Sequence, residues 1–288
     1  MSKIKTAEIF YSIQGEGRWA GVPSVFFRTF GCNFQCRGFG LPHGERSEEP
    51  ERIASEIHKY DSYDSLPLAA TGCDSYASWH PKFKKFSPTL TIDEIAQRFV
   101  DIIPNNKWTQ ANGQDIHLVI TGGEPLLGWQ KSYIQLLQHP LLADLRNVTF
   151  ETNTTQKITK ELAAFFETQD RIHLTWSCSP KLSVSGESWD EAIQPIIAKS
   201  YFDVACGGGR SFYLKFVVSS LHDLDDVRRA VDSYQAAGVH CPVYLMPVGG
   251  TVDSYFLNAR QVAELAMQEG WSYSPRLQCD LFKNAWGT

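Results

Sequence analysis

Short apolar runs alternate along the chain with longer segments in which apolar residues recur at helical spacing. The apolar runs predict strands at residues 24–30, 116–120, 147–151, 172–176, 212–218 and 242–246. Helical spacing predicts helices at residues 92–103, 129–138, 158–168, 191–199, 223–237 and 259–269. Strands that alternate with helices form a parallel sheet. Because six such units are too few to close an eight-stranded barrel, we expect an α/β fold, an open partial barrel of mostly parallel strands with the helices outside.

Three of the expected helices carry signals at their ends. Thr91 and Glu94 stand at the spacing of a capping box, in which each side chain accepts a hydrogen bond from the backbone of the other residue. Thr159 can cap the third helix, and Gly238 follows the fifth as a left-handed cap. These signals support the strand-then-helix order.

The composition is that of a globular protein. The 288 residues are 43% hydrophobic and no shift in composition marks a linker, so we expect one domain over residues 1–288. The formal net charge of −5 argues against a nucleic-acid partner, because such partners bind basic surfaces. No apolar stretch approaches the roughly 20 residues that cross a bilayer, and the first residues lack the apolar core of a signal peptide. We therefore expect a cytoplasmic protein that acts on a small molecule and has no membrane partner.

Polar and reactive side chains follow the expected strands. Because the carboxyl ends of parallel strands meet at one edge of the sheet, these residues predict a single ligand site there. They are Cys32 and Cys36 after the first strand, Gly122, Gly123 and Glu124 after the second, Asn153 after the third, Ser179, Pro180 and Lys181 after the fourth, and Pro247 after the last. The glycine pair would let a ligand approach the backbone, and Glu124 would accept a hydrogen bond from a cationic group.

The cysteines indicate an iron–sulfur site. Two thiolates, Cys32 and Cys36, cannot hold a cubane cluster that keeps one iron open, whereas three can. Cys73 is the best placed third ligand, because Asp74 and Ser75 add a carboxylate and a hydroxyl directly behind its thiol. Buried free thiols and a zinc site are the alternatives for these three residues. We expect the remaining cysteines to be small buried hydrophobic residues; they are Cys178, Cys206, Cys241 and Cys279.

Arg28 is the one charged residue in an otherwise apolar expected strand. A buried guanidinium needs an anionic partner. One interpretation is a structural salt bridge with Glu16, and the other is a fork that binds a substrate carboxylate. The aromatic residues Tyr76, Trp79 and Phe83 leave a similar choice between a packed lid and a surface that stacks on a substrate ring, and we favour the lid.

Several segments together resemble one known family. They are residues 11–17 (YSIQGEG), 21–23 (GVP), 26–28 (FFR), 31–33 (GCN), 121–125 (TGGEP), 150–155 (FETNTT) and 177–181 (SCSPK). In these segments the chain is similar to the radical S-adenosylmethionine (SAM) enzymes called 7-carboxy-7-deazaguanine synthases, and the similarity covers nearly the whole chain outside residues 37–71. The resemblance implies a 4Fe-4S cluster and SAM as cofactors. It also implies contraction of the ring of 6-carboxy-5,6,7,8-tetrahydropterin to 7-carboxy-7-deazaguanine, with loss of ammonia.

The cluster motif departs from the family spacing of C-x3-C-x2-C followed by Asp-Thr. Phe39, three positions after Cys36, cannot bind iron, and the expected continuation comes instead at Cys73, Asp74 and Ser75. We interpret residues 37–71 as an insertion inside the cluster-binding loop that forms a polar surface excursion. Closing a loop of this length costs only about 1 to 2 kcal/mol more than closing a tight one.

The resemblance also assigns roles to individual residues. It implies that Cys32, Cys36 and Cys73 bind the cluster and that Ser75 binds magnesium. The residues implied to contact SAM are Gly72, Cys73, Asp74, Gly122, Gly123, Glu124, Asn153, Ser179, Pro180, Lys181 and Pro247. Those implied to contact the substrate are Ile13, Gln14, Gly15, Glu16, Arg28, Thr121 and Thr288. An electron donor such as flavodoxin is an expected partner, and the oligomeric state, monomer or homodimer, stays open.

Two other functions must be separated from this one. A radical SAM activase for a glycyl-radical protein shares the cofactor and the partial barrel, but Gln14, Glu16 and Arg28 favour a small substrate over a protein partner. A non-catalytic zinc or iron–sulfur binding module would need no substrate pocket. Zinc is colourless, so an absorption spectrum of the anaerobically reconstituted protein separates a zinc module from an iron–sulfur enzyme.

Overall fold

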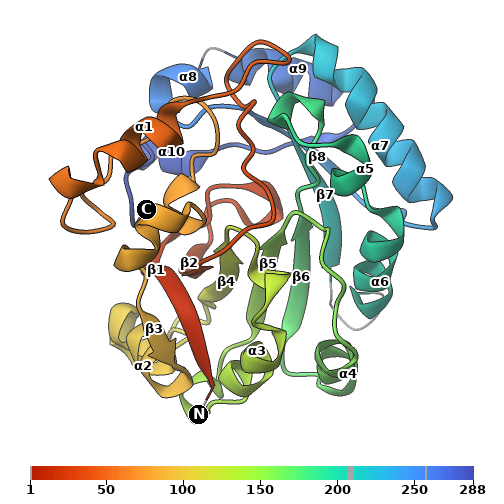
Figure 1. Cartoon of the computed structure of the whole chain (residues 1–288). Coiled ribbons are helices and arrows are strands. Elements are labelled where there is room, and N and C mark those ends of the chain that lie inside the picture. Colours follow the sequence, from red (N-terminus) through yellow and green to blue (C-terminus); the bar gives the residue numbers. More distant parts are fainter. Residues whose placement is uncertain (1, 206–210, 257) are drawn as a thin grey trace.

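A mixed sheet of nine strands runs through the described part of the molecule, in the order β3-β1-β2-β4-β5-β6-β7-β8-β9 (Figure 1). The structure is a computed structural model and describes residues 2–205, 211–256 and 258–288. The strands are β1 (Lys3–Ile13), β2 (Pro23–Thr29), β3 (Thr89–Thr91), β4 (His117–Gly122), β5 (Asn147–Thr152), β6 (His173–Cys178), β7 (Ser211–Val218), β8 (Val243–Pro247) and β9 (Ser272–Tyr273). From β2 to β9 all neighbouring strands are parallel, and β3 and β9 form two separate edges.

The six strands expected from the sequence are β2, β4, β5, β6, β7 and β8, and the expected fold class, an open partial barrel, is confirmed. The sequence prediction missed β1, β3 and β9. In β1 the charged residues Lys3, Lys5 and Glu8 interrupt the apolar ones, so the strand has no continuous apolar run. It pairs antiparallel with β2 on one side and with β3 on the other.

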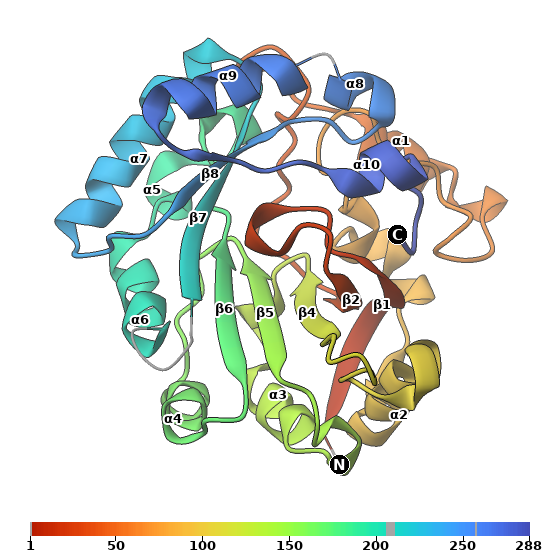
Figure 2. The ribbon, with the colours of Figure 1, turned by 180° about the vertical axis from the view of Figure 1, so that it is seen from behind.

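Helices lie along the outer face of the curved sheet, and α1, α8 and α10 lie beyond the ends of its strands, as Figures 1 and 2 show from opposite sides. They are α1 (Glu49–Ser55), α2 (Ile92–Ile102), α3 (Gln130–Leu137), α4 (Lys160–Thr168), α5 (Trp189–Ala192), α6 (Pro195–Ala205), α7 (Leu224–Ala236), α8 (Val252–Phe256), α9 (Ala259–Glu269) and α10 (Leu277–Phe282). The expected capping box begins α2, Thr159 caps α4, and Gly238 adopts a left-handed conformation after α7.

One expected helix differs from the structure. The segment predicted as a single helix at 191–199 is divided between α5 and α6, because Ile193 has an extended backbone. Pro195 then begins α6, at a position where the missing N–H of proline costs no helical hydrogen bond.

The parallel strands separate apolar from polar side chains by their alternation. Large apolar side chains on one face pack beneath the helices; they include Phe27, Leu118, Phe150, Trp176 and Phe216. Polar side chains on the inner face line a pocket; they include Arg28, Thr121, Glu151, Ser177 and Lys215. The register places Arg28 beside Thr121 and Glu151 beside Ser177, so these groups form one continuous polar strip.

Residues 37–71 differ from the expected surface excursion. Helix α1 and the turns after it build a second apolar cluster from Ile53, Ala54, Tyr63, Leu66 and Ala69, together with Tyr76, Ala77 and Phe83. The indole of Trp286 packs against Tyr63, with ring centroids 4.9 Å apart, and its N–H donates to the Leu66 carbonyl at 2.7 Å. Figure 1 shows this orange segment beside the last residues of the chain. The segment is therefore part of the folded core at this end of the sheet.

None of the helices in the described residues is both long and apolar enough to cross a bilayer.

The second apolar cluster predicts a specific loss of stability. Ile53 is fully buried, so Ile53→Ala should lower the free energy of unfolding by about 2 to 5 kcal/mol through lost contacts and a residual cavity. Ile196 in α6 is 77% exposed and gives a matched control, for which we expect a change within about 0.5 kcal/mol. Urea denaturation of both variants measures the difference, and equal midpoints would show that residues 37–71 do not contribute to the core.

Candidate active site

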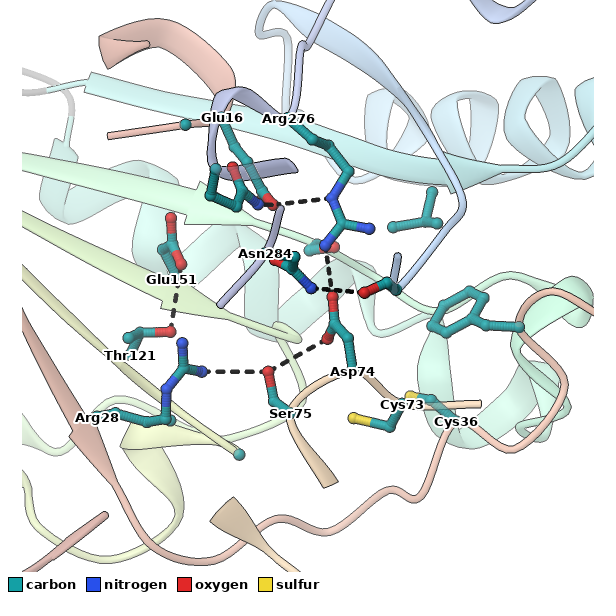
Figure 3. A pocket seen from close by; sticks show the side chains of 18 of the residues that line it. Glu16, Arg28, Cys36, Cys73, Asp74, Ser75, Thr121, Glu151, Arg276 and Asn284 are labelled. Carbon is teal, nitrogen blue, oxygen red and sulfur yellow. Dashed lines mark hydrogen bonds and ion pairs between the residues drawn. The ribbon is translucent and has the colours of Figure 1, made fainter. Parts of the chain in front are cut away.

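The pocket lies at the carboxyl ends of the parallel strands and gathers most of the residues singled out in the sequence. Those that line it are Ile13, Gln14, Gly15, Glu16, Arg28, Cys32, Cys36, Gly72, Cys73, Asp74, Ser75, Thr121, Gly122, Gly123, Asn153, Ser179, Lys181 and Thr288. Three others, Glu124, Pro180 and Pro247, lie outside its lining. Figure 3 shows two ends of the pocket, with Cys36 and Cys73 at one and Glu16, Arg28 and Glu151 at the other.

The thiol end is assembled from two distant segments. Cys32 and Cys36 lie on the loop after β2, and Cys73 enters from the end of the long segment that follows; all three thiols are free. Glu187 holds the first loop by accepting hydrogen bonds from the backbone N–H groups of Gln35, at 2.8 Å, and Cys36, at 2.6 Å. Cys36 itself has a left-handed backbone, with φ at 49°. A strained residue held in place in this way is typical of a functional loop.

The thiols are protonated in the folded chain without metal. Burial raises the pKa of Cys32 to about 12 and that of Cys73 to about 11, and it raises the pKa of Cys36 well above its usual value. Lys181 acts in the opposite direction on all three. Metal ions bind the thiolate form, so binding of iron here must release protons and stabilise the buried charge.

The donors at this end fit an iron–sulfur cluster better than a single ion. Among the described residues, no three His, Cys, Asp or Glu side chains are arranged around one metal ion. In a cubane cluster each thiolate binds a different iron, so the three thiols need not meet at one point. The backbone N–H of Phe34 approaches the Cys32 sulfur at 3.4 Å, and such hydrogen bonds to sulfur are common around clusters.

The glycine pair after β4 serves a purpose that the sequence did not reveal. A Cβ atom on Gly123 would lie 2.4 Å from the Gly31 carbonyl oxygen and 2.7 Å from the Cys32 Cβ. A Cβ on Gly122 would lie 2.4 Å from the Thr29 carbonyl oxygen. The two glycines therefore lie against the end of β2 and the loop that carries Cys32. Without side chains, they let the loops after β2 and β4 pack in direct contact.

Glu124 ties these loops together from behind the pocket. Its carboxylate accepts hydrogen bonds from the Thr152 hydroxyl at 2.9 Å, the Asn153 backbone N–H at 2.7 Å and the Leu126 N–H at 2.9 Å. Burial raises its pKa to about 7, although these hydrogen bonds act in the opposite direction. With its acceptor capacity used inside the protein, Glu124 orders the ends of β4 and β5.

A chain of buried charges forms the other end. Glu16 pairs with Lys215 of β7, accepts a hydrogen bond from Gln278 at 2.7 Å and lies 3.5 Å from the Nε of Arg276. Burial alone would raise the pKa of Glu16, but the charges of Lys215 and Arg276 outweigh it and hold the pKa at about 2. Arg276 also donates to the Asp74 carboxylate at 2.5 Å, so the chain reaches the residue next to Cys73 (Figure 3).

Arg28 has a different partner from the expected one. Its Nε donates to Glu8 on the neighbouring strand β1 at 3.0 Å, and not to Glu16. Glu8 stands opposite Arg28 in the antiparallel register, a pairing that could not be inferred while β1 was unrecognised. The Nη1 of Arg28 donates to the Ser75 hydroxyl at 3.1 Å, and Ser75 donates in turn to Asp74 at 3.2 Å.

Sequence reasoning missed several charged residues of the pocket: Glu8, Glu151, Lys215 and Arg276. Glu151 accepts hydrogen bonds from Gln14 at 3.1 Å and from Thr121 at 3.2 Å, and so joins two expected substrate residues. The available signal was a charged residue within an apolar strand, as at Glu151 and Lys215. Arg28 in β2 carries the same signal.

The other sequence expectations have mixed outcomes. Cys178 and Cys279 are buried as expected, Cys241 is only partly buried, and Cys206 lies outside the described residues. Tyr76 and Phe83 pack in the second apolar cluster, as expected of a lid. Trp79 belongs to that cluster but also lines the pocket.

An open parallel barrel with free thiols gathered beyond the carboxyl ends of its strands defines a radical SAM enzyme. Comparisons with known proteins specify the family. No family model matches the chain. It is 30% identical to a 7-carboxy-7-deazaguanine synthase of Halobacterium salinarum over 294 residues, which cover 96% of this chain and 90% of the relative. It is 26% identical to the synthase of Pyrobaculum aerophilum, with 99% and 97% covered.

The chain thus belongs to the 7-carboxy-7-deazaguanine synthase family. The crystal structure of QueE from Escherichia coli shares the fold, with a TM-score of 0.53 at 17% sequence identity over 94% of this chain and 93% of that one. The resemblance found in the sequence is confirmed. As a radical SAM lyase, the enzyme uses SAM and an iron–sulfur cluster and acts on a small molecule.

The position of Cys73 in the pocket generates a test of the cluster ligands. Cys73→Ala should remove one of three thiolates and sharply reduce the iron bound after anaerobic reconstitution. Cys241→Ala is the matched control, because Cys241 is a free thiol outside this pocket and should leave iron content unchanged. Iron assay and absorption spectroscopy measure both variants. Wild-type iron content in the Cys73 variant would exclude it as a ligand.

Proposed function

We propose that this chain converts 6-carboxy-5,6,7,8-tetrahydropterin to 7-carboxy-7-deazaguanine, with loss of ammonia. The observation that supports this proposal most directly is the two-ended pocket. Three thiols stand at one end, and a buried set of hydrogen-bonding and charged side chains stands at the other. The first end suits a cluster with its SAM, and the second suits a flat polar ring that carries a carboxylate.

At the thiol end we propose Cys32, Cys36 and Cys73 as cluster ligands. When bound, the cluster and SAM supply the radical that removes a hydrogen atom from the substrate. The SAM residues we propose are those of the expected set that line the pocket: Gly72, Cys73, Asp74, Gly122, Gly123, Asn153, Ser179 and Lys181. We propose that Glu124, Pro180 and Pro247 support this region indirectly, since they lie outside the lining.

At the polar end the side chains are held in place before any substrate binds. Gln14 is nearly fully buried, and its amide is oriented by Glu151. We propose that Gln14, Glu16, Thr121 and Glu151 bind the amide and amino edge of the pterin, with Ile13, Gly15 and Thr288 beside them. Side chains already fixed by their neighbours lose little freedom when the substrate binds, so they orient the reacting hydrogen well.

Arg28 is our proposed ligand for the substrate carboxylate. Its side chain is 17% exposed, at the pocket, and two of its nitrogens are already fixed by Glu8 and Ser75. Its Nη2 makes no hydrogen bond with the described residues and is available to an anion. Burial lowers the pKa of Arg28, but the charge of Glu8 raises it more, so the guanidinium stays charged in this apolar setting.

Apolar side chains enclose the pocket and can keep water from the reaction. Phe39 and Leu68 come from residues 37–71, Met246 from β8, and Trp286 from the last residues of the chain. We propose that residues 1–288 form one domain in which 37–71 are an insertion that supplies this wall. Excluding water strengthens the polar contacts inside the site and protects reactive species.

We further propose that an electron donor such as flavodoxin reduces the cluster, that a second copy of the chain can complete a homodimer, and that the enzyme works in the cytoplasm. Free cysteines and an oxygen-sensitive cluster suit a reducing compartment. An activase for a glycyl-radical protein is the weaker candidate. Such an enzyme must admit a protein segment, whereas the polar end of this pocket is formed by buried side chains.

Turnover tests the proposed function directly. The reconstituted wild-type protein should form 7-carboxy-7-deazaguanine from the carboxypterin, SAM and a chemical reductant under strictly anaerobic conditions, as detected by mass. A protein that carries the cluster and cleaves SAM without making deazaguanine would contradict the substrate. A colourless protein that binds zinc in place of iron would contradict the enzyme class.

The role of Arg28 predicts a defect in substrate use. A lysine ammonium cannot replace a planar guanidinium that donates to Glu8, Ser75 and the substrate carboxylate in fixed directions, so Arg28→Lys should lower kcat/KM for the carboxypterin by about 30-fold, which is about 2 kcal/mol. Iron content and SAM cleavage should be unchanged. Arg228→Lys is the matched control, because Arg228 pairs with Glu269 on the surface and should keep normal turnover. Near-normal turnover by Arg28→Lys would exclude Arg28 as the ligand of the substrate carboxylate.

Magnesium is the cofactor that the present side chains fit least directly. The Ser75 hydroxyl accepts a hydrogen bond from Arg28, and a guanidinium beside it repels a divalent cation. We propose that Ser75 binds Mg²⁺ only after the substrate carboxylate pairs with Arg28 and adds its own oxygen to the ion's ligands. This order suits Mg²⁺, which keeps most of its waters and takes few protein ligands.

Binding measurements can test that order. Isothermal titration of the reconstituted protein with Mg²⁺ should give little heat alone and a clear isotherm when substrate is present. Ser75→Ala should abolish the second signal, and Ser78→Ala, three residues on and bonded to the Ser75 carbonyl, should retain it. Equal Mg²⁺ affinity with and without substrate would contradict the coupling.

A further inference from the structure

Trp79 is a pocket residue to which the reaction described above gives no role. It follows the short 3₁₀ helix Tyr76–Ser78, which begins immediately after Cys73, Asp74 and Ser75. The indole is 9% exposed and belongs to the second apolar cluster while also lining the pocket. Its ring lies 5.6 Å from that of His80, centroid to centroid.

The indole N–H of Trp79 is buried and has no hydrogen-bond partner among the described residues. The buried indole of Trp108 donates to the Leu141 carbonyl at 3.1 Å, and the partly buried indole of Trp286 donates to that of Leu66 at 2.7 Å. Trp176 also lacks a partner, but it stacks on Tyr201 in the core and does not line the pocket. A buried donor without an acceptor is costly and indicates a group that binds there.

Sulfur is the acceptor that the surroundings offer. Cys73 and Cys32 both pack against the apolar cluster that contains Trp79. Trp79, Cys32 and Cys73 also line the same pocket, so both sulfurs share the surroundings of the indole.

We propose that Trp79 tunes the iron–sulfur cluster by donating its indole N–H to the Cys73 sulfur once that sulfur binds iron. This inference rests on the proposed function, because it requires the cluster at Cys32, Cys36 and Cys73. A hydrogen bond to a ligating sulfur stabilises the reduced cluster more than the oxidised one, because the reduced cluster carries one more negative charge. Trp79 then makes the one-electron reduction, the first event in the enzyme's cycle, easier.

The test compares two variants that each remove one donor from the same apolar cluster. Trp79→Phe keeps an aromatic ring and loses the N–H. Tyr76→Phe is the matched control, because the Tyr76 hydroxyl donates to the Pro67 carbonyl at 2.7 Å, away from the thiols. Both variants should bind iron as the wild type does. Redox titration followed by electron paramagnetic resonance should show reduction about tenfold less favourable in Trp79→Phe, a shift of about 59 mV to lower potential for one electron, and no shift in Tyr76→Phe.

A second measurement uses the wild-type protein and so does not depend on iron binding by the Trp79 variant. Wild-type protein made with tryptophan labelled with ¹⁵N in the indole should show a weak nitrogen coupling to the reduced cluster in pulsed resonance spectra, and Tyr76→Phe should keep it. An unchanged potential in iron-loaded Trp79→Phe, or no indole coupling in the wild type, would overturn the inference alone. A wild-type protein that binds no iron would overturn the proposed function as well.

Discussion

A chain of buried opposite charges links the parts of this molecule that are farthest apart in sequence. Lys215 in β7 pairs with Glu16 after β1, and Glu16 lies beside Arg276 near the end of the sequence. Arg276 in turn pairs with Asp74, the residue after Cys73. A buried charge is costly unless it is paired and hydrogen-bonded. Each of these charged side chains therefore depends on its neighbour to offset the cost of burial. The ion pairs hold the two ends of the pocket in one geometry.

That constraint explains why the pocket can be both charged and enclosed. Most of the charges on its walls are satisfied by the protein, so removing water from it leaves few of them unpaired. The groups with unused hydrogen-bonding capacity, such as the Arg28 Nη2 and the Trp79 N–H, are then the ones that a ligand can complete. These unpaired groups therefore indicate which ligands the site can bind.

The sequence predicted the parallel strands because their apolar runs are local and continuous, and it predicted the thiol loops because they follow those runs. It missed β1, whose charged residues hide the strand period, and with it the pairing of Glu8 with Arg28. It also did not show that the Glu124 carboxylate accepts hydrogen bonds from the end of β5. These features depend on which distant segments meet, and no local pattern encodes that.

The long separation between Cys36 and Cys73 has a consequence for how the metal site is built. In a tight C-x3-C-x2-C loop the three thiols are neighbours even in the unfolded chain, so iron can be gathered early. Here the third thiol reaches the others only after α1 and the second apolar cluster have formed, because those elements carry the chain back to β2. Contacts between residues far apart in sequence form late. With the proposed ligands Cys32, Cys36 and Cys73, assembly of the cluster thus follows tertiary folding, and a nascent or partly unfolded chain offers iron only a two-cysteine site.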